Sequence, residues 1–254
     1  MVNKMEVYAI CLDNETARKS FLQSNLSALD LVPKYVGIDG KYITLEQRNI
    51  YSEGDAKRRW GRVLTDGEIG VYLSHLAVWK DIIGRNIDFA LIIESDAVVT
   101  KTTINIVQAL LLKGIRIDMV MLSWLDCVPS FWGRKTLVPG YDLVRFSRKS
   151  HGAAGYLLSM HGAKELVKYS DKITMPVDEL MCGGQIKKDM EIYAIYPQAI
   201  GLIKDSDGSS VLKHERDSVR GRIAPGVKPR KVGLKRFEQF VRHFMLQLKM
   251  PPEV

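Results

Sequence analysis

A short apolar run that ends in two acidic residues constrains the fold of this chain more than any other feature. The run spans residues 89–99 and reads FALIIESDAVV, with Glu94 and Asp96 two positions apart. Short runs rich in Ile, Leu and Val are typical of strands that are covered on both faces. Charged side chains are rarely buried without a partner. We therefore expect Glu94 and Asp96 at the carboxyl end of a buried strand, where open α/β sheets bind their ligands.

The spacing of these two carboxylates bears on what they could bind. Side chains two positions apart on an extended chain point the same way, so both can face one crevice. Two hard oxygen ligands on one side suit a divalent cation that also holds phosphate oxygens. The same side chains could instead be solvated or cap the next element, and the local sequence leaves both interpretations open.

Length and composition fit one large α/β domain, with or without a small appendage. The chain has 254 residues, of which 46% are hydrophobic, enough for a sizeable core. It contains no apolar run near the ~20 residues that span a bilayer, and its first residues predict a strand rather than a signal peptide. Cys11, Cys127 and Cys182 lie far apart, without metal-binding spacing. We therefore expect a cytoplasmic protein with reduced core thiols.

Positive charge is concentrated in the last part of the chain. Residues 211–254 hold eleven Lys or Arg against four acidic residues, a net of +7 out of +8 for the whole chain. The nearly neutral body, residues 1–210, argues against a nucleic-acid-binding protein. Apolar residues recur at helical spacing from Leu234 to Leu248, with basic residues among them. This pattern predicts either a basic amphipathic helix on an anionic membrane surface or a terminal helix docked on the body.

Alternating strand and helix patterns over the body predict a mainly parallel sheet flanked by helices. Thr65 and Glu68 have the spacing of a capping box at the start of a helix that runs to about residue 83. The aromatic segment with Trp124, Phe131 and Trp132 is expected to be irregular, and its tryptophans either stack on sugars or simply pack. The other strands are predicted at about 5–12, 34–38, 119–122, 143–146, 155–159 and 192–197, and further helices at 15–29, 160–169 and from 176 onward.

Four of these segments match one known family in their residue pattern and in their order along the chain. They are residues 64–79 (LTDGEIGVYLSHLAVW), 90–96 (ALIIESD), 155–159 (GYLLS) and 176–178 (PVD). The first two are specific, and the last two are weak individually but collinear. Together the segments resemble glycosyltransferase family 25, the lipopolysaccharide-biosynthesis transferases whose relatives include collagen galactosyltransferases. The resemblance covers roughly residues 5–200.

The resemblance implies a GT-A-like (Rossmann-like) nucleotide-sugar fold over residues 1–210, followed by the basic helical tail of residues 211–254. It also implies a UDP-sugar donor, often UDP-galactose, a divalent metal such as Mn²⁺ or Mg²⁺, and inversion at the anomeric carbon. The family usually has Glu-Asp-Asp at the strand end, whereas this chain has Ser95 in the middle position. The outer carboxylates act in a site of this type, so Glu94 and Asp96 preserve the working pair.

Catalytic roles then follow for the acidic residues. We expect Asp96 to be the metal ligand and Glu94 to be a metal-shell or ribose contact, since the charge that develops on the leaving diphosphate must be neutralised. Inversion also needs a general base that takes the proton of the acceptor hydroxyl. Asp178 is the first choice for this base and Glu179 is the reserve, although Asp178 could instead only cap its helix.

Further residues could contact the donor. His75 could bind donor phosphate or substrate, although a histidine on a helix is often only packed or solvated. Arg18 could pair with phosphate and Asp39 could approach the nucleotide, and each also fits an ordinary surface or turn position. His214 and Ser209–Ser210 lie where many transferases keep a late phosphate or metal contact.

Two classes of function fit these features. The leading hypothesis is an inverting, metal-dependent hexosyltransferase, with galactose as the expected sugar and a lipid-linked lipopolysaccharide or lipooligosaccharide acceptor. Its basic tail would hold it at the inner face of the cytoplasmic membrane, near that anionic acceptor. The alternative is a non-catalytic member of the same fold that binds a nucleotide-sugar or glycan or scaffolds other enzymes, and Ser95 is the feature that favours it.

Overall fold

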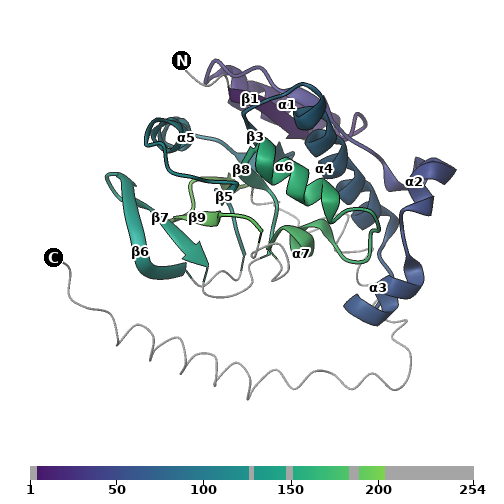
Figure 1. Cartoon of the computed structure of the whole chain (residues 1–254). Helices are drawn as coiled ribbons and strands as arrows, with labels where there is room; N and C mark the ends of the chain where they lie inside the picture. The colour runs from purple at the N-terminus through teal and green to yellow at the C-terminus, as the bar shows by residue number, and fades with distance from the viewer. Residues whose placement is uncertain (1–4, 126–128, 147–150, 183–188, 204–254) are drawn as a thin grey trace.

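The structure, a computed structural model, describes residues 5–125, 129–146, 151–182 and 189–203. Over these residues the chain forms an α/β fold around an eight-stranded sheet (Figure 1). The predicted tail over 211–254 lies outside the described residues. So do Ser209–Ser210, His214 and Cys127. Cys11 and Cys182 are buried, as expected of core cysteines. In the described part, no helix has both the length and the apolar character needed to cross a membrane.

The sheet is mixed rather than parallel throughout. Its strands are β1 Met5–Ile10, β2 Lys34–Val36, β3 Phe89–Glu94, β5 Met119–Met121, β6 Pro129–Val138, β7 Tyr141–Phe146, β8 Gly155–Ser159 and β9 Ile192–Tyr196. They lie in the order β2-β1-β3-β8-β5-β9-β7-β6. β1 is parallel to β2 and β3, and β5 is parallel to β9, whereas β8 runs antiparallel between β3 and β5. The expected parallel arrangement therefore holds on the β2-β1-β3 side, and the insertion of β8 ends it.

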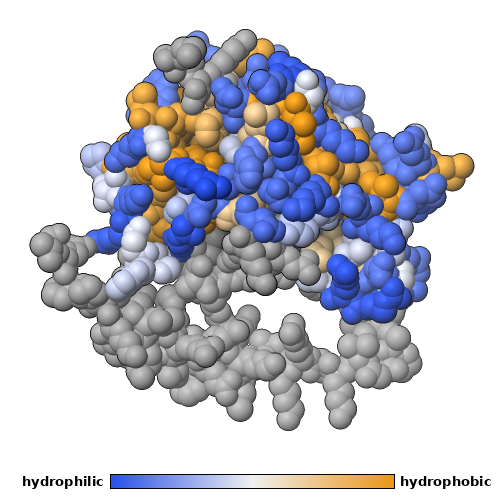
Figure 2. Space-filling view, in the orientation of Figure 1, coloured by the Kyte–Doolittle hydropathy of each residue, from blue (hydrophilic) through white to orange (hydrophobic). Residues whose placement is uncertain are grey.

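Helices cover both faces of this sheet. They are α1 Thr16–Ser27, α2 Leu45–Asn49, α3 Glu53–Trp60, α4 Asp66–Gly84, α5 Lys101–Leu112, α6 Met160–Lys168 and α7 Val177–Cys182. α4, α6 and α7 cover the face that carries Tyr8 and Ile92, and α4 and α6 lie side by side there (Figure 1). α1 and α5 cover the opposite face, which carries Val7 and Leu91. Neighbouring strand residues are thus buried under different helix layers, while the outer surface in Figure 2 is largely hydrophilic.

Two segments differ from the prediction. The aromatic segment was expected to be irregular, and Trp124 does lie outside any strand, but Phe131 and Trp132 belong to β6, which pairs with β7. Its register shifts between Ser130 and Lys135 and again between Thr136 and Val138, and such bulges remove the regular alternation that reveals a strand. The sequence patterns also did not predict α5. Its capping box uses Thr103 in place of the usual Glu or Gln, so the ordinary start signal is absent.

The start of α4 has the predicted capping box and an added ion pair. Thr65 Oγ1 accepts a hydrogen bond from Glu68 N at 3.1 Å, and Glu68 Oε2 accepts one from Thr65 N at 3.1 Å. Arg62 pairs with the same carboxylate: its Nη1 lies 2.7 Å from Glu68 Oε2 and its Nη2 lies 2.7 Å from Glu68 Oε1. Because Glu68 is buried, this two-point pairing compensates its charge and fixes the position of the helix start.

Two glycines, Gly70 and Gly40, let α4 pack closely against the turn that follows β2. A Cβ at Gly70 would lie 2.5 Å from both Gly40 N and Ile38 O. Ser74, one turn further along α4, accepts a hydrogen bond from Ile38 N at 2.9 Å and donates one to Gly70 O at 2.8 Å. Backbone therefore meets backbone with no room for a side chain, and this contact sets how far α4 stands from the strand ends.

Substituting Gly70 by Ala should destabilise the fold, because the new methyl group would collide with the backbone of Gly40 and Ile38. We expect Gly70→Ala to lower the free energy of unfolding by about 1–3 kcal/mol, measured by chemical denaturation. Gly84→Ala is the matched control in the same helix. No atom stands within 4 Å of its Cβ position, so alanine should stabilise by up to about 1 kcal/mol. Equal stability of the two variants would contradict the close approach.

Candidate functional site

Three parallel strands end at one edge of the sheet, and the segments that follow them line a cavity of about 410 Å³, the larger cavity. Ile10 of β1 is in register with both Val36 of β2 and Glu94 of β3, so the three strands stop at one level. The start of α1 and one side of α4 complete the wall. This is the strand-end crevice where the apolar run and its two carboxylates were expected to lie.

A second cavity of about 260 Å³, the smaller cavity, adjoins the first. Both cavities are lined by Val71, Glu94 and Asp96. The smaller one is also lined by Asp178 at the start of α7 and by Trp124 after β5. Glu94 ends β3 and Asp96 lies in the turn that follows, so the two are not on one extended strand, yet both stand in the wall common to the two cavities.

Two other predicted site residues line the larger cavity with them. Arg18, from α1, lies 3.6 Å from the carboxylate of Glu15 and so keeps an ion pair at the cavity wall. Asp39 Oδ1 accepts a hydrogen bond from Lys41 N at 2.9 Å, which orders the turn after β2. The structure thus brings Arg18, Asp39 and the end of β3 together around one space, while the contacts that each would make to a ligand remain predictions.

His75 lies behind the site rather than in it. Its ring is fully buried and lines neither cavity. Its Nε2 is 3.1 Å from Glu94 Oε1, and its Nδ1 is 2.8 Å from the hydroxyl of Tyr156. Its burial fits the packed alternative rather than a direct contact with donor phosphate, because in this arrangement the ring reaches a ligand only through Glu94.

The two candidates for the general base are separated by the structure. Asp178 lines the smaller cavity, and its oxygens accept hydrogen bonds from Glu179 N at 3.0 Å and Gly152 N at 3.3 Å. Glu179 lines neither cavity, is buried, and lies 2.9 Å from Nδ1 of His151. Of the two carboxylates, only that of Asp178 borders a space that could hold a substrate.

The end of β3 supplies hard oxygen ligands without forming a complete protein cage. Within residues 5–125, 129–146, 151–182 and 189–203, no group of three or more His, Cys, Asp or Glu could hold a metal by itself. Glu94 and Asp96 do match the way Mg²⁺ and related ions are commonly bound, by one or two carboxylates together with the phosphates of a substrate. The residues present therefore fit a cation shared with a phosphorylated ligand.

Burial and neighbouring groups raise the pKa of two further side chains near the cavities, those of Cys11 and Arg62. Burial, followed by the nearby Glu15 carboxylate, raises the pKa of the Cys11 thiol to about 11, so this thiol in the larger cavity is a weak nucleophile at neutral pH. The hydrogen bonds from Arg62 to Glu68 raise the pKa of the guanidinium, and Asp178 adds a smaller contribution in the same direction. Arg62 therefore stays protonated and paired with Glu68, a residue of the wall of the smaller cavity, and the two charges compensate each other.

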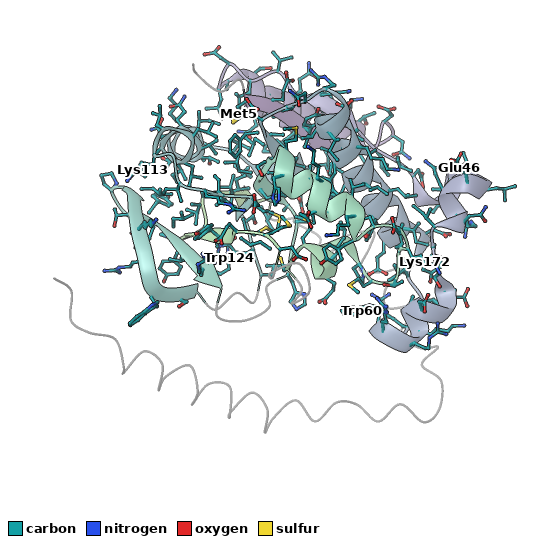
Figure 3. The ribbon with its side chains drawn as sticks, viewed as in Figure 1. Met5, Glu46, Trp60, Lys113, Trp124 and Lys172 are labelled. Carbon is teal, nitrogen blue, oxygen red and sulfur yellow. The ribbon has the colours of Figure 1, made fainter. Side chains whose placement is uncertain are left out.

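Trp124 forms part of the wall of the smaller cavity, beside β9 (Figure 3). Its Nε1 donates a hydrogen bond to Ile195 O at 3.0 Å, and its ring stacks on Tyr196 with an interplanar angle of 16°. These contacts hold a partly exposed aromatic ring at the cavity. Trp132, by contrast, is 60% exposed on β6 and lines neither cavity.

Several residues of the site were not singled out from the sequence. Ser74 lines the larger cavity, and Trp79 and Tyr156 hold His75 from behind. A partial signal exists for Trp79, because residues four apart on a helix share a face and it follows His75 at that spacing. Tyr156 has no local signal, since it reaches His75 from β8, which is 81 positions away along the chain.

Known proteins are similar to this chain over most of the described residues. The profile of glycosyltransferase family 25 (LPS biosynthesis protein) matches residues 4–181. Procollagen galactosyltransferase 1-A from Xenopus laevis is 32% identical over 192 residues, which cover 69% of this chain and 30% of that protein. Procollagen galactosyltransferase 2 from Homo sapiens is 28% identical over 190 residues, which cover 69% and 29%. The "Probable inactive glycosyltransferase 25 family member 3" from Rattus norvegicus is 24% identical over 186 residues, which cover 69% and 32%.

The chain spans about three-tenths of the length of these relatives. The family match from residue 4 to residue 181 includes the end of β3, the helix α4 and Asp178. It therefore contains the walls of both cavities except for the part contributed by Leu202. The family that the sequence segments resembled is confirmed: this chain belongs to glycosyltransferase family 25.

Proposed function

We propose that this protein transfers a hexose, with galactose as the first candidate, from a UDP-sugar to a hydroxyl group of an acceptor. The observation that carries the proposal is that Glu94 and Asp96 line both cavities at the ends of parallel strands. A transferase needs two adjoining sites whose contents meet at one reacting bond, and the shared carboxylates mark such a junction. The family and the names of the galactosyltransferase relatives support this class of reaction.

The larger cavity is the proposed donor site. Arg18 and Lys41 offer cationic groups for the diphosphate, and Asp39 offers an acceptor for ribose hydroxyl groups. Gly37 and Gly40 also line this cavity, and glycine lets a ligand approach the backbone closely. The volume of about 410 Å³ is within the range of small-molecule sites.

A divalent cation, Mn²⁺ or Mg²⁺, would be held by Asp96 and Glu94 together with the donor diphosphate. When bound, it supplies positive charge against the negative charge that develops on the leaving group. Asp96 is the proposed ligand, and Glu94 completes the metal shell or contacts ribose. Ser95 lies between them, largely buried, and lines only the larger cavity, so it leaves the outer carboxylates in the common wall.

Asp178 is the proposed general base. Its two backbone hydrogen bonds hold the carboxylate in the wall of the smaller cavity, where an acceptor hydroxyl would bind. In the proposed step the hydroxyl gives its proton to Asp178 while its oxygen bonds to the anomeric carbon. The bond from that carbon to the UDP oxygen breaks, and UDP leaves with the electron pair. Attack on the face away from UDP inverts the anomeric configuration.

The acceptor would bind in the smaller cavity against the ring of Trp124, whose flat apolar face suits the C–H face of a sugar. We infer a lipid-linked oligosaccharide of the lipopolysaccharide type, which the description of the family supports. The names of the relatives indicate procollagen as their substrate, and a collagen-type acceptor is the competing choice. The net charge of +7 over residues 211–254 would hold the protein at the anionic inner face of the cytoplasmic membrane.

The second candidate function is non-catalytic binding of a nucleotide-sugar or glycan. It is favoured by Ser95 between the two carboxylates and by the relative whose name describes it as inactive. UDP binding that needs Mn²⁺, with no transfer or hydrolysis over a panel of UDP-sugars, would support this candidate. Turnover of any one donor in the same panel would exclude it.

Neutralising Asp96 and Asp178 should separate binding from chemistry. Asp96→Asn should weaken Mn²⁺-dependent UDP binding and lower transfer by about 100-fold or more. Asp178→Asn should retain UDP binding and lower kcat by about 100- to 10,000-fold, the usual effect of losing a general base. Calorimetric UDP titrations and initial rates, each with Mn²⁺ or with a chelator, measure both effects.

Asp30→Asn is the control for these substitutions, since it makes the same chemical change at an exposed turn after α1. It should retain the rates and affinity of the unmodified protein. Undiminished transfer by Asp96→Asn would rule out its assigned metal role. Loss of UDP binding in Asp178→Asn would show that Asp178 acts on the donor side instead.

Removing the basic tail should separate membrane binding from catalysis. A chain truncated after residue 226 should lose its binding to anionic liposomes, because most of the tail's apolar face and much of its positive charge are gone. Transfer to a soluble acceptor should continue at the original rate. Vesicles of neutral lipid serve as the control in co-sedimentation. Anionic-liposome binding that survives the truncation would argue that the tail has another role.

A further inference from the structure

Glu94 is backed by a chain of hydrogen bonds that leads into the core. Trp79 Nε1 lies 2.9 Å from the hydroxyl oxygen of Tyr156, and that oxygen lies 2.8 Å from Nδ1 of His75. His75 Nε2 then lies 3.1 Å from Glu94 Oε1. Trp79, Tyr156 and His75 are all fully buried, so water does not compete for these contacts. Only Glu94, with 27% of its side chain exposed, reaches the cavities.

The chemistry of the groups gives the chain a direction. The indole of Trp79 can only donate, so the oxygen of Tyr156 accepts from it. The hydroxyl proton of Tyr156 then goes to the remaining neighbour, Nδ1 of His75. An ionised carboxylate can only accept, so Nε2 of His75 carries the proton that Glu94 receives. Every donor has an acceptor, with the imidazole neutral and protonated at Nε2.

Packing reinforces this arrangement. The rings of His75 and Tyr156 stack with centroids 5.7 Å apart, and the ring of Trp79 lies 6.1 Å from that of His75. Burial raises the pKa of Tyr156 well above its usual range, so its hydroxyl keeps the proton that it donates. A flipped imidazole would turn carbon atoms toward both Glu94 and Tyr156 and would lose both hydrogen bonds.

We propose that His75, oriented by Tyr156 and Trp79, is a positioning residue that fixes the carboxylate of Glu94 for the binding of donor and cation. This inference rests on the proposed function, because it assigns Glu94 to the site where UDP and the cation would meet. His75 uses Oε1 of Glu94, which leaves the second oxygen for a ligand. Partners of this kind commonly orient metal-binding groups, and their loss costs about 10- to 100-fold in affinity or activity.

Tyr156→Phe tests the chain of hydrogen bonds behind Glu94, because it removes one oxygen atom and little else. The matched control is Tyr72→Phe. The hydroxyl that it removes is buried on α4, lies 3.0 Å from Ser170 Oγ, and belongs to a residue that lines neither cavity. Tyr156→Phe loses two buried hydrogen bonds and Tyr72→Phe loses one, so both should lower the melting temperature, Tyr156→Phe by more. Tyr156→Phe should also weaken UDP binding in the presence of Mn²⁺ by about 5-fold or more, whereas Tyr72→Phe should stay within 2-fold.

Substitutions of His75 provide a test by rescue. Glutamine can still donate an N–H to Glu94 from near the position of Nε2, whereas methionine fills similar space without a donor. We expect His75→Met to weaken Mn²⁺-dependent UDP binding by about 10- to 100-fold and His75→Gln to recover a large part of that loss. Equal losses in the two variants, at equal melting temperatures, would overturn the role assigned to the hydrogen bond.

The tautomer itself can be measured without any ligand. In protein labelled with ¹⁵N-histidine, long-range ¹H–¹⁵N spectra should show His75 as neutral and protonated at Nε2, its signals identified by their absence in His75→Gln. Protonation at Nδ1 would overturn the proposed direction. If the unmodified protein fails to bind UDP with Mn²⁺, the proposed function fails while the tautomer is still tested. If it binds and Tyr156→Phe binds equally well, the positioning role fails while the proposed function stands.

Discussion

The backbone contact between α4 and the turn after β2 is the constraint on which the rest of the site depends. Gly70 and Gly40 leave no room for side chains there, so α4 lies close against the ends of the parallel strands. That closeness places Val71 in the wall common to both cavities and brings His75 within reach of Glu94. The fixed start of the helix, with Arg62 paired to Glu68, keeps it there.

The antiparallel strand β8 also contributes to this geometry. β8 runs antiparallel beside β3, and its Tyr156 is in register with Ile92, two residues before Glu94. Both side chains lie on the face covered by α4, so the hydroxyl of Tyr156 meets His75 under that helix. The strand that interrupts the parallel order therefore supports the carboxylate at the strand end, and the proposed division into donor and acceptor cavities is built around that carboxylate.

The sequence was most informative where local patterns decide structure. The apolar run of β3 and the capping box of α4 were both predicted, because each depends on residues within a few positions of one another. The position of β8 was not, since strand order is set by pairings between distant segments. For the same reason the pattern could place Glu94 and Asp96 in one crevice but left open whether His75 contacts a ligand or is packed. Its burial depends on Tyr156, which lies far away in the sequence.

The central claim is that Glu94 and Asp96 join a donor site to an acceptor site. An experimental structure with UDP and Mn²⁺ bound tests it most directly. The account predicts the uridine and diphosphate in the larger cavity, the cation between the diphosphate and Asp96, and Glu94 still hydrogen-bonded to His75. UDP bound elsewhere, or a cation held without either carboxylate, would contradict it.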